Sequence, residues 1–525
     1  MVQGLSVTGF MDTFSFASGV GAIVPNGAGS VVQGDFLGLT PTGGAAPNSN
    51  GVFTFNRSSP TLFARIGGVA ASARNVISGN TNTGLSLESP GGTVQGNLIG
   101  VTPAGSAALG NGIGVFLFGN NGSLHAAIGG TSAGAGNVIG GNRTDGVLLL
   151  NDSGSTVAGN EIGTNARGTA ALPNAGDGVQ VKLSINGETI GGTGAGARNI
   201  IGGNTGNGIE LNGGSGTLVQ GNWIGIGAAR APLANAGNGV SLHSLAAVNT
   251  AERADMIGGT ASGAGNTIAN NGGNGVLIGS SPTDSATGGA AVRGNAIYNN
   301  PLGISLNGEY PASCPNGPSS GPNDFFPCPT IAFATTGAVR GVAVPNSQVD
   351  VYLAGEVAND GGHGEGTTYL GTARADGNGT WSLALAPGRV AAGQRVTATA
   401  TGIGPTNTAP ENSEFGANVT VVAPARPAVY VANGANSAVH AYALGATGNA
   451  TPLGTLAGAA TALNGTGGLA LDSAGDLFVA NQGASSVTAY APQASGNVAP
   501  IATIVGALGA ARTLEHHSSN HPPKN

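Results

Sequence analysis

The sequence predicts an all-β chain in which residues 1–307 coil into a parallel β-helix. An Asn-Val/Ile-Ile landmark recurs at Asn75, Asn137 and Asn199, in two steps of 62 residues. A fixed period of this kind indicates a stack of like units rather than a single globular core. Within one unit, short β-branched or Leu-rich segments such as 209–211 alternate with Gly and Asn, and no segment keeps a helical period. These features are typical of short strands joined by tight turns.

The repeat length favours a solenoid over a propeller. We expect each 62-residue unit to hold about three coils of roughly 21 residues, too few for a four-stranded blade, which gives roughly 14 coils over residues 2–307. Val, Ile and Leu then point inward, and Asn residues stack at the bends, where each amide bonds the amides above and below. Glycine supplies the left-handed backbone angles that such bends need.

Three motifs carry a resemblance to known proteins: the segments 96–100 (GNLIG), 190–192 (IGG) and 196–204 (GARNIIGGN). They resemble the repeats of right-handed parallel β-helix proteins, and in particular those of large bacterial surface proteins with a pectate-lyase-like solenoid. The resemblance covers about residues 2–307. It implies an architecture and is weak for activity.

Composition narrows the function classes. Charged residues make up 8% of the chain, against an average near 25%, and the net charge is −7. The 17 Lys and Arg residues form no basic patch, so nucleic acid is excluded as a partner. No apolar run is long enough for a membrane-spanning helix. Residues 1–10 already read as a coil and lack a signal peptide, so we expect an export signal to have been lost by truncation, and the protein to be an extracellular or cell-surface monomer.

Residues 308–329 predict a linker, because Pro, Ser, Asn and Gly dominate there. The segment holds the two cysteines of the chain, Cys314 and Cys328. A disulfide between them would stabilise the fold by about 3 kcal/mol in the chain-entropy model. Two cysteines in one loop favour this bond over two free thiols, and the bond in turn indicates an oxidising compartment.

Residues 330–423 predict a β-sandwich, with period-two segments and turns every eight to twelve residues. The expected strands include 348–353, 368–373 and 395–401. Through Gly379-Thr380-Trp381 and Asn412-Ser413-Glu414-Phe415 the segment resembles bacterial Ig-like modules.

Residues 424–512 carry a second repeat. Val429-Tyr430-Val431-Ala432-Asn433 returns 48 residues later as Leu477-Phe478-Val479-Ala480-Asn481. This period is typical of propeller blades, and the segment resembles NHL-type repeats. Two blades form only an incomplete β-propeller. Residues 513–525 abandon the repeat, and we expect a disordered tail there.

Charged residues that could carry catalysis are few. The candidates are Asp145, Asp152, Asp177 and Lys182, because β-helix enzymes that cut polysaccharides cluster carboxylates beside a cation on one face. By the expected coil alignment, Asp145 and Asp177 occupy turn positions that Asn fills in other units, and stacking aligns them badly. Asp and Asn interchange at turns because both accept local backbone bonds.

We therefore expect a structural and adhesive protein that binds polysaccharide or cell-surface glycan weakly and needs no cofactor or metal. The alternative is a polysaccharide lyase or glycoside hydrolase that acts on one face of the helix. A row of three or more carboxylate or Lys/Arg side chains within reach of one sugar ring would favour the enzyme.

Overall fold

The structure is a computed structural model. It describes residues 1–11, 21–25, 29–54, 64–88, 90–119, 124–184, 187–245, 252–306, 320–355, 361–404, 409–423, 428–472 and 475–506. These residues form two compact units: 1–331 with 341–383 and 394–419, and 332–340 with 384–393 and 420–525. Each unit is described by itself.

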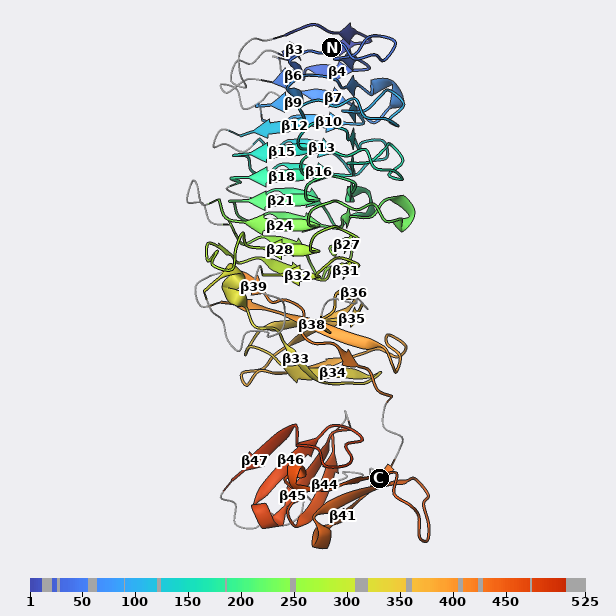
Figure 1. Cartoon of the computed structure of the whole chain (residues 1–525), viewed down its shortest axis with the longest axis vertical. Helices are drawn as coiled ribbons and strands as arrows, with labels where there is room; N and C mark the ends of the chain where they lie inside the picture. Colours follow the sequence, from blue (N-terminus) through green and yellow to red (C-terminus); the bar gives the residue numbers. More distant parts are fainter. Residues whose placement is uncertain are drawn as a thin grey trace, which may run out of the picture. The chain divides into compact units, whose positions relative to one another are not determined.

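The first unit contains the predicted parallel β-helix. Its strands form three ten-stranded parallel sheets, here named A, B and C, with nine turns between the first and tenth strands. Figure 1 shows the strands of sheet C stacked one above another along the helix. Sheet A comprises β1 (Val2–Gln3), β4 (Val31–Gln33), β7 (Arg65–Gly67), β10 (Thr93–Gln95), β13 (Ala127–Gly129), β16 (Thr156–Ala158), β19 (Thr189–Gly191), β22 (Leu218–Gln220), β26 (Met256–Gly258) and β30 (Ala291–Arg293).

The other two sheets follow the same order. Sheet B comprises β2 (Ser6–Val7), β5 (Phe36–Leu37), β8 (Val76–Ile77), β11 (Leu98–Ile99), β14 (Val138–Ile139), β17 (Glu161–Ile162), β20 (Ile200–Ile201), β23 (Trp223–Ile224), β27 (Thr267–Ala269) and β31 (Ala296–Tyr298). Sheet C comprises β3 (Gly21–Ile23), β6 (Asn50–Thr54), β9 (Thr83–Leu87), β12 (Ile113–Phe118), β15 (Val147–Leu150), β18 (Val179–Lys182), β21 (Ile209–Asn212), β24 (Val240–His243), β28 (Val276–Ile278) and β32 (Ile304–Ser305).

The interior of the helix is apolar, as the sequence predicts. One strand residue in two points inward, and in-register pairs such as Val94 and Ile128 stack on one another. Both side chains are fully buried. The Val, Ile and Leu residues of the three sheets form one continuous core cluster. Burying these apolar side chains is the main term that stabilises the coil stack.

The predicted coil size is wrong. Each 62-residue unit holds two coils rather than three, since sheet A strands begin at Arg65, Thr93 and Ala127. The two coils of a unit differ in the lengths of their bends. One coil has a short bend from sheet A to sheet B and a long bend from sheet B to sheet C, as between Ile99 and Ile113; the next reverses this, as between Gly129 and Val138. The alternation doubles the repeat, which explains why counting residues overestimated the number of coils.

Asparagine stacks at both of these bends, as predicted. The A–B column contains Asn75, Asn97, Asn137, Asn160, Asn199, Asn222, Asn266 and Asn295, and each Nδ2 up to Asn266 donates to the next Oδ1 at 2.9–3.1 Å. The B–C column contains Asn48, Asn80, Asn111, Asn142, Asn174, Asn204, Asn235, Asn271 and Asn300, joined in the same way. All these side chains are buried. Buried amides that are fully bonded fix the bends.

A sheet from the segment after the helix closes the end of the B–C column. The sheet has the order β36 (Gly366–Arg374), β35 (Gln348–Ala354), β38 (Arg395–Ile403) and β39 (Pro410–Asn412), with β40 (Val419–Thr420) paired to β38. Glu365, at its edge, accepts from the backbone N–H and the Nδ2 of Asn300 at 2.9 and 3.0 Å. Tyr352 and Phe415 join the core cluster of the helix. Strands β35, β36, β38 and β39 belong to the same compact unit as the helix.

A buried ion pair holds the same junction. Arg293, at the end of β30, donates through Nε and Nη2 to the two oxygens of Asp350 at 2.7 Å each. The side chain of Asp350 is fully buried and that of Arg293 is 14% exposed. A bidentate pair in this geometry fixes orientation, and removing one partner alone would leave a buried charge unpaired.

Two insertions interrupt the last coils and meet each other. Strand β25 (Glu252–Arg253) lies in the first and pairs in parallel with β29 (Thr287–Gly288) in the second. Ser244 donates to Asp284 at 2.9 Å across the same pair of insertions.

The remaining strands are short and mostly antiparallel. A three-stranded sheet contains β33 (Thr330–Ala334), β34 (Ala338–Val342) and β37 (Thr380–Ala384). In the second unit, β41 (Ala428–Asn433), β42 (Ala438–Ala443) and β43 (Gly454–Leu456) form one sheet. A second sheet contains β44 (Thr466–Leu471), β45 (Leu477–Asn481), β46 (Ser486–Tyr490) and β47 (Ala502–Val505). The two sheets share a small core that includes Val439, Leu456 and Tyr490.

Candidate functional site

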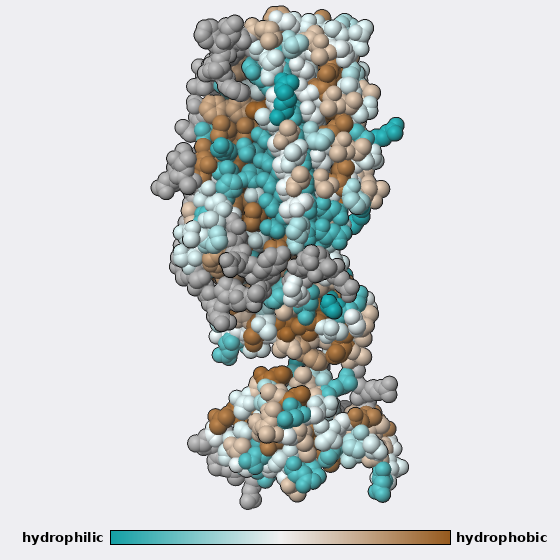
Figure 2. All heavy atoms as spheres, in the orientation of Figure 1, coloured by the Kyte–Doolittle hydropathy of each residue, from teal (hydrophilic) through white to brown (hydrophobic). Residues whose placement is uncertain are grey.

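The outer face of sheet C carries an apolar platform over β12 and β15. Phe116 and Phe118 point outward from β12, with ring centroids 6.1 Å apart and planes inclined by 15°. Leu148 and Leu150 of β15 lie in register beside them, and all four side chains are partly exposed. Figure 2 shows hydrophobic atoms gathered at this level of the face. The platform presents a flat apolar surface to solvent.

Polar side chains continue the same rows over the next strands. Leu148 is in register with Gln180, which is in register with Glu210. The neighbouring row runs from Leu150 to Lys182. It then continues through the residues Asn212 and His243. Figure 2 shows hydrophilic atoms gathered beside the apolar platform on this face. The two kinds of surface therefore adjoin along one side of the helix.

A third column, here the sheet C column, borders the polar rows at the turns that precede the strands. It consists of Asp145, Asp177, Asn207, Asn238 and Asn274. Each Oδ1 accepts the backbone N–H of the next member at 2.7–2.8 Å. The glycine before each of the later members makes this close stacking possible, since a Cβ on Gly206 would lie 2.5 Å from the Oδ1 of Asp177.

Burial and like charges perturb the two acids of this column. Burial raises the pKa of Asp177 to about 6, the hydrogen bond from Asn207 N–H opposes the rise, and the charges of Glu210 and Asp145 add to it. Burial also raises the pKa of Asp145, against the hydrogen bond from Asp177 N–H and the charge of Lys182. Asp177 Oδ2 accepts from Gln180 at 3.3 Å. Asp177 is therefore part protonated near neutral pH.

Glu210 links the column to a histidine. Its Oε2 accepts from Asn207 Nδ2 at 2.8 Å, and its Oε1 lies 2.8 Å from His243 Nδ1. The hydrogen bond to Glu210 raises the pKa of His243, and burial opposes the rise. Glu210 is 5% exposed, whereas the side chain of His243 is 26% exposed. The pair presents a protonatable group at the surface of the polar rows.

The structure brings three of the four predicted residues together. Asp145, Asp177 and Lys182 lie on adjacent coils of sheet C, so the expectation that stacking aligns them badly is wrong. The error follows from the coil count, because two coils per unit place Asp145 and Asp177 in one column. Asp152 lies elsewhere, at the buried bend from sheet C to sheet A, where its Oδ1 accepts from Leu124 N–H at 2.9 Å.

Asp152 has a structural environment. Burial raises its pKa, and burial raises the pKa of Glu188 on the next coil to about 8, with the charge of Asp152 adding to the rise. Glu188 accepts from Ser155 N–H at 2.7 Å and from the hydroxyl of Ser184 at 3.3 Å. Both acids are 1% exposed, and they fix a bend.

Glu210 and His243 were not predicted from the sequence. A local signal exists for the first, since the third residue after each Asp-Gly or Asn-Gly turn points outward. Asp177, Asn207 and Asn238 are followed at that distance by Gln180, Glu210 and Ser241. His243 lies two residues beyond Ser241 on the same face. Only the register between coils places it against Glu210.

Two further features lie outside this face. Trp223 points outward from sheet B between two arginines, with Arg198 4.6 Å and Arg230 5.6 Å from the ring centroid. Within the described residues, no group of three or more His, Cys, Asp or Glu side chains is arranged to hold a metal ion. None of the helices in the described part of the chain is long and apolar enough to cross a membrane.

No protein-family model matches the chain, and no curated protein does. Among solved structures, the chain is similar to the A-module of a mannuronan C-5 epimerase from Azotobacter vinelandii, with 16% identity, a TM-score of 0.21, and 54% of this chain and 90% of that chain covered. It is also similar to full-length tailspike protein 2 of an Escherichia coli O157:H7 bacteriophage, with 10% identity, a TM-score of 0.27, and 74% and 64% covered. The chain thus spans less than two thirds of that tailspike. Similarities at this level identify no function for the chain.

Proposed function

We propose that the protein is an exported glycan-binding protein of structural or adhesive role, and that it binds sugar chains on the outer face of sheet C. The observation that supports this is the register of the face, where the apolar platform continues into polar rows. A sugar ring offers an apolar C–H face and a rim of hydroxyl groups. Phe116 and Phe118 suit the first, and Gln180, Lys182 and Asn212 suit the second.

The charges of the face restrict the glycan. Asp145, Asp177 and Glu210 are acidic, against Lys182 and His243. A uronate polymer would bring further carboxylates to a surface that already holds three, and like charges at this range repel. The face therefore favours neutral sugar chains over acidic ones.

The test is binding to neutral and acidic polysaccharides, measured by affinity gel electrophoresis. Phe116→Ala removes the centre of the platform and should weaken binding to a neutral glycan by about ten-fold, the equivalent of about 1.4 kcal/mol. Thr156→Ala, an exposed change on sheet A, serves as the matched control. Retention of polygalacturonate in preference to all neutral polymers, if Phe116→Ala weakens that retention, or equal binding by both variants, would contradict the proposal.

Catalysis is the second candidate, as a glycoside hydrolase or polysaccharide lyase. It is favoured by the pair Asp177 and Glu210, because Asp177 is held part protonated beside a second carboxylate that contacts His243. Both oxygens of Glu210 already accept hydrogen bonds, from Asn207 and His243, and this argues against Glu210 as a catalytic acid or base. Release of reducing or unsaturated ends that is abolished by Glu210→Gln and by Asp145→Ala would favour the enzyme.

We also propose that residues 330–423 form an Ig-like spacer and residues 424–512 form NHL-type blades. Antiparallel strands in both segments support this. The disulfide between Cys314 and Cys328 also remains a proposal, because Cys314 lies outside the described residues. Alkylation of unreduced exported protein should label no thiol, and labelling of two thiols would exclude the bond.

A further inference from the structure

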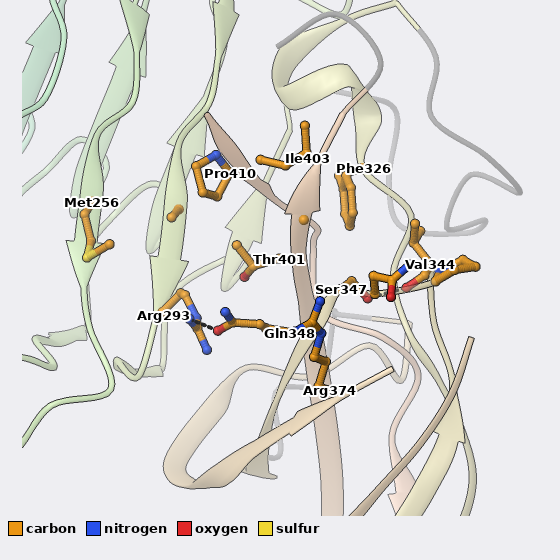
Figure 3. A pocket seen from close by; sticks show the side chains of 14 residues that line it. Met256, Arg293, Phe326, Val344, Ser347, Gln348, Arg374, Thr401, Ile403 and Pro410 are labelled. Atoms are coloured by element: carbon orange, nitrogen blue, oxygen red, sulfur yellow. Dashed lines mark hydrogen bonds between the residues drawn. The ribbon is translucent and has the colours of Figure 1, made fainter. Parts of the chain in front are cut away.

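A cavity of about 380 Å³ lies where the last coils of the helix meet the sheet of β35, β36 and β38. Figure 3 shows it between Met256 and Arg293 of the helix and Ser347, Thr401 and Arg374 of that sheet. All of these residues belong to one compact unit. The volume lies within the range of about 300–1,000 Å³ that small-molecule sites occupy.

The lining is positively charged although the chain carries a net charge of −7. Two of its side chains are arginines, Arg293 and Arg374, and none is Asp or Glu. Arg293 is already neutralised, since it donates to Asp350 and to the side-chain oxygen of Gln348. Arg374 is exposed, and within the described residues it makes no ion pair. One guanidinium is therefore available to a ligand.

The opposite side of the cavity is apolar. Figure 3 shows Phe326, Ile403 and Pro410 together on that side, across from Gln348 and Arg374. Phe326 is buried at 1% exposure, whereas Ile403 is 60% exposed. Ile403 and the exposed Pro410, backed by the buried Phe326, provide a wall against which an apolar ligand face can pack.

We propose that this cavity binds an acidic sugar, with its carboxylate on Arg374 and its ring against Ile403 and Pro410. A guanidinium matches a carboxylate by two parallel N–H···O bonds, whereas a phosphate cluster or an acidic peptide would call for several free cations. The amides of Asn346 and Gln348 line the cavity and offer neutral partners for ring hydroxyls. The site is separate from the face of sheet C, and its charge preference is the opposite.

Binding of D-glucuronate to the full chain, measured by isothermal titration calorimetry, tests the proposal. D-glucose keeps the ring without the charge, and acetate keeps the charge without the ring, so both should bind at least about ten-fold more weakly. Arg374→Gln should weaken glucuronate binding by about ten-fold or more. Arg395→Gln, an exposed change on β38 that does not line the cavity, should leave it unchanged.

Three results would overturn the proposal. The first is an absence of saturable glucuronate binding up to about 10 mM, well above the Kd of about 1 mM that a weak sugar site would have. The second is equal loss in Arg374→Gln and Arg395→Gln, which would indicate diffuse charge attraction. The third is equal affinity for glucose and glucuronate, which would remove the role of Arg374. Thermal unfolding of both variants without ligand checks that each is folded.

Discussion

The A–B column and the sheet C column are built from the same kind of residue, yet they tolerate different chemistry. In the A–B column, Asn199 Oδ1 accepts from the backbone N–H and the Nδ2 of Asn160, both at 3.0 Å. Its own Nδ2 donates to Val157 O and to Asn222 Oδ1 at 2.8 and 2.9 Å. Each asparagine from Asn75 to Asn266 both donates and accepts.

In the sheet C column, each side chain needs only one acceptor oxygen to bond the next coil. Asp177 Oδ1 accepts from Asn207 N–H, and its second oxygen lies toward Gln180. One acceptor atom is enough to hold the turn, so a carboxylate is as suitable as an amide. Asp145 and Asp177 can therefore occupy this column.

In the A–B column a carboxylate, Asp35, stands at the start, where its Oδ1 accepts from Leu5 N–H and its own N–H donates to Asn75 Oδ1. A carboxylate between two asparagines of that column would set oxygen against oxygen with no solvent. The two columns therefore differ in function. The amides of the A–B column only stabilise the bends, whereas Asp177 in the sheet C column has a second carboxylate oxygen that faces the outer side of the sheet.

Exchanging amide for carboxylate in each column tests this distinction most strongly. Asn199→Asp removes two buried donors and buries a charge, and should lower the free energy of unfolding by about 3–5 kcal/mol. Asn238→Asp, the matched change in the sheet C column, removes one part-buried donor, the Nδ2 that donates to Asn207 Oδ1 at 3.1 Å, and should lower it by no more than about 1.5 kcal/mol. Denaturant unfolding of both variants measures the difference. Equal losses would mean that exposure and donor count do not distinguish the columns.

The end of the B–C column gives a smaller effect. Asn300 is the last asparagine of this column, and Glu365 accepts its two hydrogen bonds without donating to a further coil. Glu365→Ala leaves both donors of Asn300 without this partner, and should lower the free energy of unfolding by about 2 kcal/mol. Glu365→Gln keeps the acceptor and should lower it less. If the Gln variant is as unstable as the Ala variant, the ionised carboxylate rather than its place at the end of the column is what matters.

The smallest expected effect is a pH dependence of the sheet C column. The pKa of Asp177 is raised from 3.8 to about 6 in the folded protein, so the folded state binds the proton more tightly than the unfolded state. This contribution to stability is complete below about pH 4 and is lost as the pH rises to about 6. Asp177→Asn should remove that decline, gaining on the original protein by about 1–2 kcal/mol between these pH values.

Unfolding of both proteins at several pH values measures this difference, and effects of other groups cancel between them. A gain that falls with rising pH would give the opposite sign and would show that the Asp177 pKa is lowered.

The sequence by itself determined the coiled all-β architecture and its extent. Period, β-branched segments and stacked Asn are local properties, and a parallel coil repeats local properties at every level. The positions of Asn75, Asn137 and Asn199 were enough to predict a buried amide column. The cysteine pair remains a prediction from sequence, because Cys314 lies outside the described residues.

The tertiary structure alone decided which residues meet. Composition and period do not distinguish three short coils from two coils with alternating long bends, and this choice sets every contact between coils. It placed Asp145 above Asp177 and Glu210 beside His243, and it moved Asp152 into a buried bend. The closure of the helix by Glu365 and Asp350 was equally invisible in the sequence, because these residues lie more than fifty positions from Asn300 and Arg293 in the chain. Local periodicity predicts a stack of coils, whereas the contacts between coils depend on the length of each bend.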